Sequence, residues 1–136
     1  MISAITKLAS GRLCAPTPSQ YAVRPALEGE RGFLDDFIQA IKRRRDFAVA
    51  RISEIKGLSC VAPEAAFYLM VKADGVGESG DGAFVLDLLE ATAVLTVPGS
   101  GFGADPREGY FRIVYLPNEN TLATVFNSIQ LFMDKR

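Results

Sequence analysis

Apolar residues recur every three or four positions along most of this chain, which is the spacing of one face of an α-helix. A short stripe of this kind begins at Ile2 and ends before Gly11. The longest stripe predicts a helix of about 24 residues that ends before Gly57. Its apolar face consists of Phe33, Leu34, Phe37, Ile38, Ile41, Ala48, Ile52 and Ile55. Two further stripes predict helices that begin at Asp81 and Asn118, because both residue types cap helix N-termini.

Other segments have the pattern of strands or loops. Residues 15–18 are proline-rich and predict a loop, after which Ser19 can cap a short helix over residues 20–28. Four strands are predicted, and they cover residues 58–61, 66–72, 93–97 and 110–116. The second reads AFYLMVK, which is too apolar for a surface strand. This strand is followed by a helix and another strand, and that order predicts a right-handed crossover between parallel strands. The expected fold class is α+β, with a small mixed sheet of about four strands packed against helices.

Arg112 interrupts the last predicted strand, which is otherwise apolar. Successive strand residues point to opposite sides of a sheet, so Arg112 shares one side with Tyr110 and Val114. Phe111 and Ile113 occupy the other side. A guanidinium among apolar neighbours needs an anion. That anion is either an Asp or Glu of this chain or a ligand carboxylate, which matches the two parallel N–H donors of a guanidinium.

The segment P-G-S-G-F-G, residues 98–103, has glycines at alternate positions just before that strand. It joins two predicted strands and opens no helix, so it is not a dinucleotide-binding fingerprint. One interpretation is a plain flexible connection. The other is a mobile flap whose glycines let the backbone approach a ligand while Phe102 closes over that ligand and excludes water.

Composition narrows the possible functions. The chain has 136 residues and a formal net charge of -1, which fits one domain over residues 1–136 and argues against a nucleic-acid partner. It contains no histidine, which excludes Ser/His and Cys/His nucleophile pairs and His-ligated metal sites. Cys14 and Cys60 lack metal-binding spacing, and no apolar run approaches the roughly 20 residues of a membrane span. We therefore expect a soluble cytoplasmic protein with no bound metal and no membrane partner.

Three other polar groups have plain structural interpretations. The run K-R-R-R at residues 42–45 is expected on a solvated helix face, balanced by aspartates, rather than in an anion site. Residues 74–81 lack the alternating ligands of a calcium loop and are expected to form a surface turn. Tyr68 and Tyr115 are expected in the core with their hydroxyls hydrogen-bonded.

Four stretches of the sequence together resemble a known family. They read RLCAPTPSQYAV, RRRDFAVARISEIKGLSCVAPEAAFYLMVK, AVLTVPGSGFG and YFRIVYLP. In this order they are similar to the C-terminal portion of class I and II, fold-type I pyridoxal-phosphate aminotransferases, with the alanine-aminotransferase-like branch the most similar. The resemblance implies the small domain of an enzyme that transfers an amino group between an amino acid and a 2-oxo acid and that acts as a homodimer.

The resemblance also implies roles for particular residues. Arg112 stands where the family's arginine holds the α-carboxylate of the substrate. The loop that closes over the substrate corresponds to Ser100, Gly101 and Phe102. Thr17 and Gln20 lie in the stretch that reaches toward the cofactor phosphate of the neighbouring subunit. Related enzymes often have Ser-Asn in that stretch, where this chain has Ala15-Pro16.

The same resemblance implies that part of the active site is missing from this chain. In the family, the lysine that binds pyridoxal phosphate covalently and the other cofactor ligands precede the matching region. Lys7, followed by Gly11-Arg12, is weakly similar to the motif around that lysine, but the spacing is wrong. We therefore expect no catalytic residue here and no activity of the chain alone. The alternative is a non-catalytic module that self-associates or binds a partner.

Overall fold

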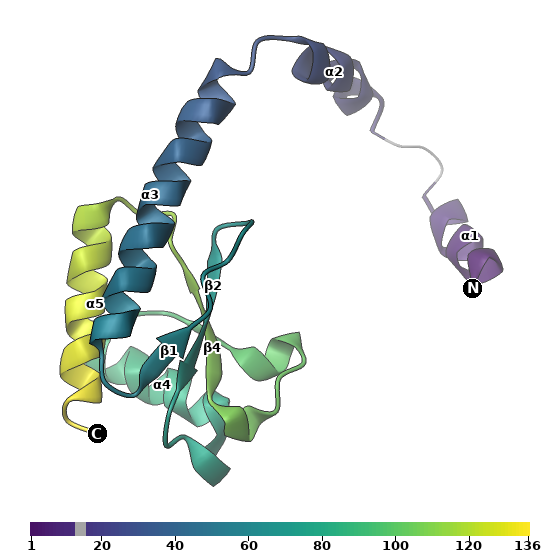
Figure 1. Ribbon diagram of the computed structural model, residues 1–136. Coiled ribbons are helices and arrows are strands. Elements are labelled where there is room, and N and C mark those ends of the chain that lie inside the picture. The colour runs from purple at the N-terminus through teal and green to yellow at the C-terminus, as the bar shows by residue number, and fades with distance from the viewer. Residues whose placement is uncertain (13–15) are drawn as a thin grey trace. The chain divides into compact units, whose positions relative to one another are not determined.

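The computed structural model describes residues 1–12 and 16–136, which form two compact units, Met1–Asp36 and Phe37–Arg136 (Figure 1). Cys14 and Ala15, which belong to the predicted loop and to one of the motifs, lie outside the described residues. The assignment of residues 1–136 to a single domain stays a prediction. No described helix is long and apolar enough to cross a membrane.

The first unit contains two helices, α1 (Ile2–Ser10) and α2 (Thr17–Glu28), and the start of α3 (Gly32–Glu54). Neither α1 nor α2 has a buried residue. Helix α2 starts earlier than predicted, inside the proline-rich segment, and Ser19 lies within it instead of capping it. The physical reason is that Pro18 occupies the first turn, where backbone N–H groups have no helical partner and a missing one costs little.

The second unit holds a four-stranded sheet and three helices. Its strands are β1 (Leu58–Cys60), β2 (Tyr68–Ala73), β3 (Val97–Pro98) and β4 (Tyr110–Val114). Its helices are most of α3, α4 (Gly80–Thr92) and α5 (Glu119–Met133), the last capped by Asn118 as predicted. The α+β class with a four-stranded sheet is therefore confirmed.

The strand order is β1-β2-β4-β3, and all three neighbouring pairs are antiparallel. Strands β2 and β3, which α4 connects, run in the same direction, but β4 lies between them. The expected crossover therefore joins strands that are parallel without being paired, and the sheet is antiparallel, not mixed. Strand β3 is shorter than predicted because Ala93 adopts a left-handed conformation that ends α4.

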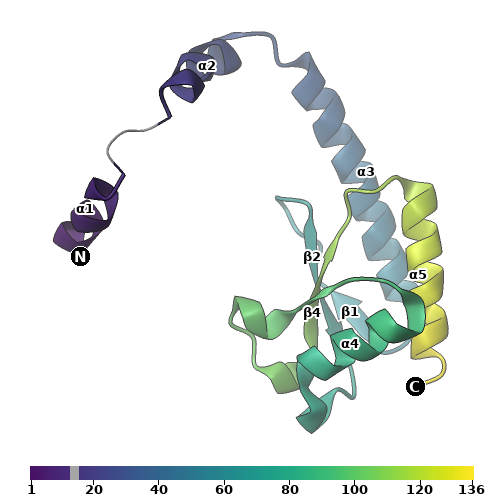
Figure 2. The ribbon, with the colours of Figure 1, turned by 180° about the vertical axis from the view of Figure 1, so that it is seen from behind.

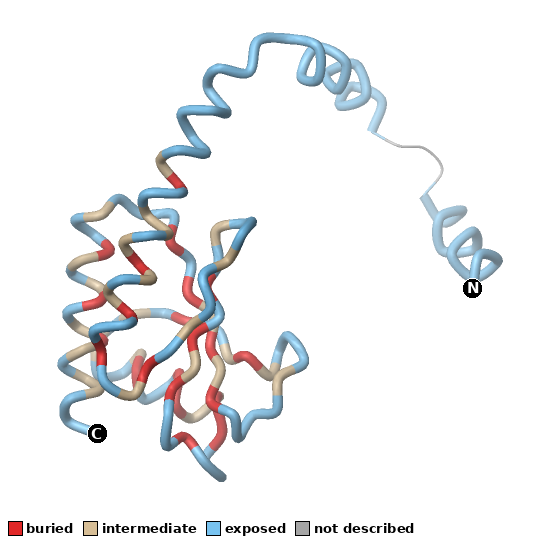
Figure 3. The backbone as a smooth tube through the Cα atoms, viewed as in Figure 1, coloured by how far each residue is buried: buried red, intermediate tan, exposed pale blue. Residues whose placement is uncertain are grey.

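The core lies on one face of the sheet, where α3, α4 and α5 pack (Figures 1 and 2). It is built from Ile41, Ala48, Ile52, Leu69, Val71, Phe84, Val85, Leu88, Phe111, Ile113, Leu122, Phe126 and Ile129. Burial alternates along the strands, as the banded tube of Figure 3 shows. Tyr68 and Met70 of β2 are each 36% exposed on the opposite face, which none of α3, α4 and α5 covers. Strand β2 is therefore an inner strand of the sheet that is buried on one face only.

We predict that Phe126→Ala lowers the free energy of unfolding by about 3–5 kcal/mol, because the side chain is fully buried among the three helices and the sheet. Phe33→Ala is the matched control, since Phe33 is 70% exposed and its truncation should cost less than about 0.5 kcal/mol. Urea unfolding followed by far-ultraviolet circular dichroism measures both. Equal losses would contradict the position of the core.

Candidate functional site

Arg112 occupies the middle of β4, at the centre of the open sheet face. Its Cα pairs with Met70 of β2 on one side and with Val97 of β3 on the other. The flanking residues Phe111 and Ile113 point into the core and are buried. The alternation along β4 therefore places the guanidinium on the face opposite α3, α4 and α5, as the sequence pattern predicts, and the residue is half-buried there.

Two aromatic rings lie against the Arg112 guanidinium. The ring centroid of Tyr68 is 4.7 Å from its Cζ and that of Phe102 is 4.3 Å from it. Tyr68 belongs to β2 and Phe102 follows β3, so the two rings come from opposite sides of β4. Both distances are within the range of cation–π attraction. The rings hold the cation in place but neutralise no charge.

Arg112 has no carboxylate partner among residues 1–12 and 16–136. Four other arginines of that part of the chain form ion pairs, namely Arg24, Arg45, Arg51 and Arg107. Arg112 makes no such pair, and its Nε is buried without a hydrogen-bond acceptor in the described structure. An ion pair within the chain, the first alternative for Arg112, is thus not found in the described part. The two Nη groups form a fork of parallel N–H donors, and this fork remains open to a carboxylate.

The segment 98–103 forms a hydrogen-bonded turn. Residues Gly99–Phe102 form a 3-10 turn. The Oδ2 of Asp81 accepts a hydrogen bond from the Ser100 backbone N–H at 2.6 Å, and its Oδ1 accepts one from the Ser100 hydroxyl at 3.0 Å. Gly99 packs so closely on Tyr110 that an added Cβ would lie 2.5 Å from the Tyr110 Cβ. The turn is therefore fixed at two successive residues.

Asp81 has a different role from the predicted one. Helix α4 begins at Gly80, so Asp81 lies in its first turn and does not cap it. Its side chain is buried, with 2% of the residue exposed, which also corrects the expectation of a surface turn at this point. The sequence showed only a helix-capping residue type before an apolar stripe. The contact with Ser100 joins positions 19 residues apart, which no local pattern reveals.

The residues predicted to lie near the substrate or the cofactor have different surroundings in the structure. Phe102 contacts Arg112 and is 52% exposed. Ser100 directs both its donors to Asp81, and Gly101 has open space where a side chain would be. Thr17 and Gln20 are exposed residues of α2 in the other unit.

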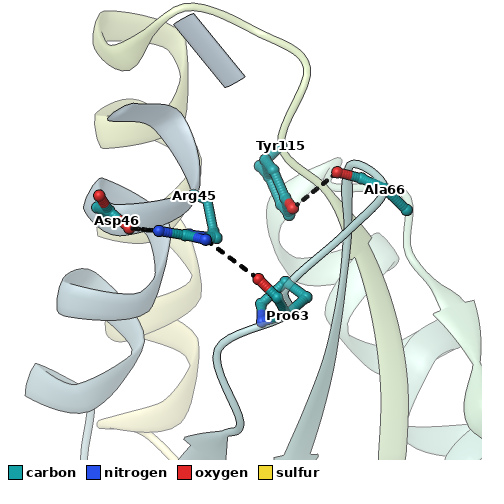
Figure 4. Close-up of polar contacts among 5 residues, drawn as sticks. All are labelled: Arg45, Asp46, Pro63, Ala66 and Tyr115. Atoms are coloured by element: carbon teal, nitrogen blue, oxygen red, sulfur yellow. Dashed lines mark hydrogen bonds and ion pairs between the residues drawn. The ribbon is translucent and has the colours of Figure 1, made fainter. Parts of the chain in front are cut away.

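Lys42 and Arg45, from the basic run at residues 42–45, line a hollow of about 520 Å³ between α3 and residues 63–67. Arg45 donates to the Asp46 carboxylate and to the Pro63 carbonyl, so its donors are already used (Figure 4). The neighbouring Arg44 donates to the Leu116 carbonyl. The Arg45–Asp46 pair is the expected balance by an aspartate, and both arginines in addition tie α3 to loops.

The two tyrosines differ in environment. Tyr115 is buried beside the same hollow, its hydroxyl donates to the Ala66 carbonyl at 3.1 Å, and burial raises its pKa (Figure 4). The core assignment is correct for Tyr115 and wrong for Tyr68, which lies on the open face beside Arg112.

The described lysines do not form a site for pyridoxal phosphate, the cofactor that the resemblance implies. This cofactor needs a lysine amine for covalent attachment, held in a defined place. Lys7, Lys42, Lys56 and Lys135 are exposed, and Lys72 lies over the Tyr110 ring at 5.9 Å. No lysine of residues 1–12 and 16–136 forms an ion pair with a carboxylate. The described lysines therefore do not account for covalent attachment of this cofactor.

Comparison with known proteins identifies the family. The sequence model of aminotransferase class I and II matches residues 1–129. The glutamate-pyruvate aminotransferase of Haemophilus influenzae is 36% identical over 137 residues, which cover 97% of this chain and 33% of that protein. The aspartate/prephenate aminotransferase of Cereibacter sphaeroides is 37% identical over 123 residues, covering 84% of this chain and 30% of that protein.

Solved structures agree with these matches. The alanine aminotransferase of Pyrococcus furiosus superposes with a TM-score of 0.88 at 39% identity, over 98% of this chain and 34% of that one. The chain thus spans about a third of the length of the relatives it matches. Sequence and fold together show that it belongs to the class I and II aminotransferases, a family of fold type I.

Proposed function

We propose that this chain is the C-terminal small domain of a pyridoxal-phosphate aminotransferase and that Arg112 binds the α-carboxylate of its amino-acid or 2-oxo-acid substrate. The observation that carries the proposal is the state of Arg112. It is a half-buried guanidinium in contact with two aromatic rings and has no ion-pair partner among the described residues, whereas four other arginines have one.

The surroundings of Arg112 suit the binding of a small carboxylate. Two Nη groups can donate parallel hydrogen bonds to the two carboxylate oxygens, which fixes the direction of the bond from that carboxylate to the α-carbon. Tyr68 and Phe102 reduce the amount of water around the fork, and lower polarity strengthens the charge attraction. Arg112 would therefore contribute by positioning the substrate, and it exchanges no proton.

The identity of the amino acid is a separate matter. Relatives that match over similar stretches bear names with alanine, glutamate-pyruvate and aspartate/prephenate. All such substrates share the α-carboxylate, which is the group that Arg112 would bind. We propose an amino acid such as alanine as the donor, in line with the alanine-aminotransferase-like motifs. Thr17 and Gln20 are proposed to lie near the cofactor phosphate of a neighbouring subunit.

Arg112→Lys tests the proposed role of the fork. Lysine keeps the positive charge but lacks two parallel donors, so we expect the dissociation constant for pyruvate to rise by about tenfold. Calorimetric or nuclear magnetic resonance titration of the chain with pyruvate measures this effect. Arg107→Lys is the control, because Arg107 already pairs with Asp105 and should leave pyruvate binding unchanged. Equal affinities of the wild-type chain and Arg112→Lys would refute the role.

A second prediction concerns activity. The isolated chain should not convert alanine and 2-oxoglutarate to pyruvate and glutamate when pyridoxal phosphate is added, because no described lysine is placed to hold the cofactor. A coupled assay for pyruvate together with absorbance spectra measures this. Turnover that disappears when one lysine is replaced by alanine would show that the chain carries its own cofactor site.

We also propose that the chain self-associates, either as part of a homodimeric enzyme or as a non-catalytic module. The supporting observation is helix α1, in which Ile2, Ile5 and Leu8 are 80%, 59% and 82% exposed and no residue is buried. A helix of nine residues is marginal in water without a packed face. The proposed occupant of this face is a second copy of the chain.

The double substitution Ile5→Glu with Leu8→Glu should shift the chain from dimer to monomer in sedimentation velocity, because it places two charges on that face. Ser3→Glu is the control on the same helix and should leave the dimer intact. A wild-type chain that sediments as a monomer at high concentration would contradict the proposal.

A further inference from the structure

We infer that Asp81 is a positioning residue that holds Phe102 over the guanidinium of Arg112 and thereby shapes the carboxylate site. The inference concerns a residue that does not itself reach the ligand, and its functional part rests on the proposed role of Arg112. Three links carry it. These are the contact of Asp81 with Ser100, the closed geometry of the Gly99–Phe102 turn, and the contact of Phe102 with Arg112.

The first link, the contact of Asp81 with Ser100, is strong because Asp81 is buried. A carboxylate taken out of water is costly unless donors satisfy it. Ser100 supplies two donors, its backbone N–H at 2.6 Å and its hydroxyl at 3.0 Å. The position of Asp81 in the first turn of α4 adds the favourable field of a helix N-terminus. No Lys or Arg of residues 1–12 and 16–136 lies within 4.0 Å of its carboxylate, so Ser100 is its main partner.

The second link transmits the position of Ser100 to Phe102. The backbone N–H of Gly103 donates to the Ser100 carbonyl at 3.2 Å, which closes the turn around Phe102. Gly103 has a φ of 93°, a left-handed conformation that suits glycine. Gly99, on the other side of Ser100, is pressed against Tyr110 of β4. A turn fixed in this way leaves the Phe102 Cα little freedom while Ser100 stays on Asp81.

The third link needs such support because Phe102 has little packing of its own. Phe102 is 52% exposed, and its ring centroid lies 4.3 Å from the Arg112 Cζ. A half-exposed ring samples other rotamers readily unless its backbone is fixed. Asp81 therefore affects the surroundings of Arg112 through the turn and not by direct contact.

Asp81→Asn tests the inference, because the amide keeps the shape but offers Ser100 only one acceptor. The readout is the side-chain Nε–H resonance of Arg112, which neighbouring rings displace from its usual position. We expect Asp81→Asn to reduce this displacement toward the value seen in Phe102→Leu and to weaken pyruvate binding by about tenfold. Asp87→Asn is the matched control, the same change at an exposed position of the same helix, and should alter neither quantity.

Ser100→Ala provides a second route if Asp81→Asn fails to fold. It removes only the hydroxyl, keeps the backbone N–H contact with Asp81, and should reduce the ring displacement in part. An unchanged Arg112 resonance in a folded Asp81→Asn or Ser100→Ala chain overturns the inference. If the wild-type chain fails to bind pyruvate, the proposed function of Arg112 is refuted, and the resonance still decides whether Asp81 positions Phe102.

Discussion

The alternation of side chains along β4 is the constraint on which the candidate site depends. Phe111 and Ile113 are buried in the core against three helices, and this burial fixes which face of the strand points inward. A slip of one residue would place the Arg112 guanidinium in that core and expose two large apolar side chains. The core therefore fixes Arg112 on the open face, and the packing energy that stabilises the fold also orients the functional side chain.

The proposed carboxylate site lies on the open face because the immediate neighbours of Arg112 there are apolar or aromatic. Met70 and Val97 flank Arg112 in register, and Tyr68 and Phe102 contact its guanidinium. An exposed arginine elsewhere in the chain, such as Arg107, is neutralised by a neighbouring carboxylate. On the open face no acidic residue of the described chain does this for Arg112, and we propose that an external carboxylate takes that place. The same property suits any substrate with an α-carboxylate, in agreement with the different amino acids in the names of the relatives.

Local patterns in the sequence were sufficient for the elements whose stability is local. The stripe of α3, the Asn118 cap of α5 and the alternation that exposes Arg112 all follow from neighbours within a few residues. The pattern could not show that β4 would lie between β2 and β3, because strand order depends on pairings between distant segments. Nor could it show the partner of Asp81, which lies 19 residues away in a glycine-rich segment that has no periodicity. The family role of Arg112 came from resemblance, whereas its lack of an ion pair in the described chain came from the structure.

The central claim is that Arg112 receives the carboxylate of the substrate. The most direct measurement is a titration of the nitrogen-15-labelled chain with pyruvate, observing the guanidinium N–H resonances of all arginines. The account predicts that the Arg112 signals shift and saturate, while those of Arg45, Arg51 and Arg107, which already hold carboxylates, stay in place. Saturable shifts at another arginine with Arg112 unmoved would contradict it.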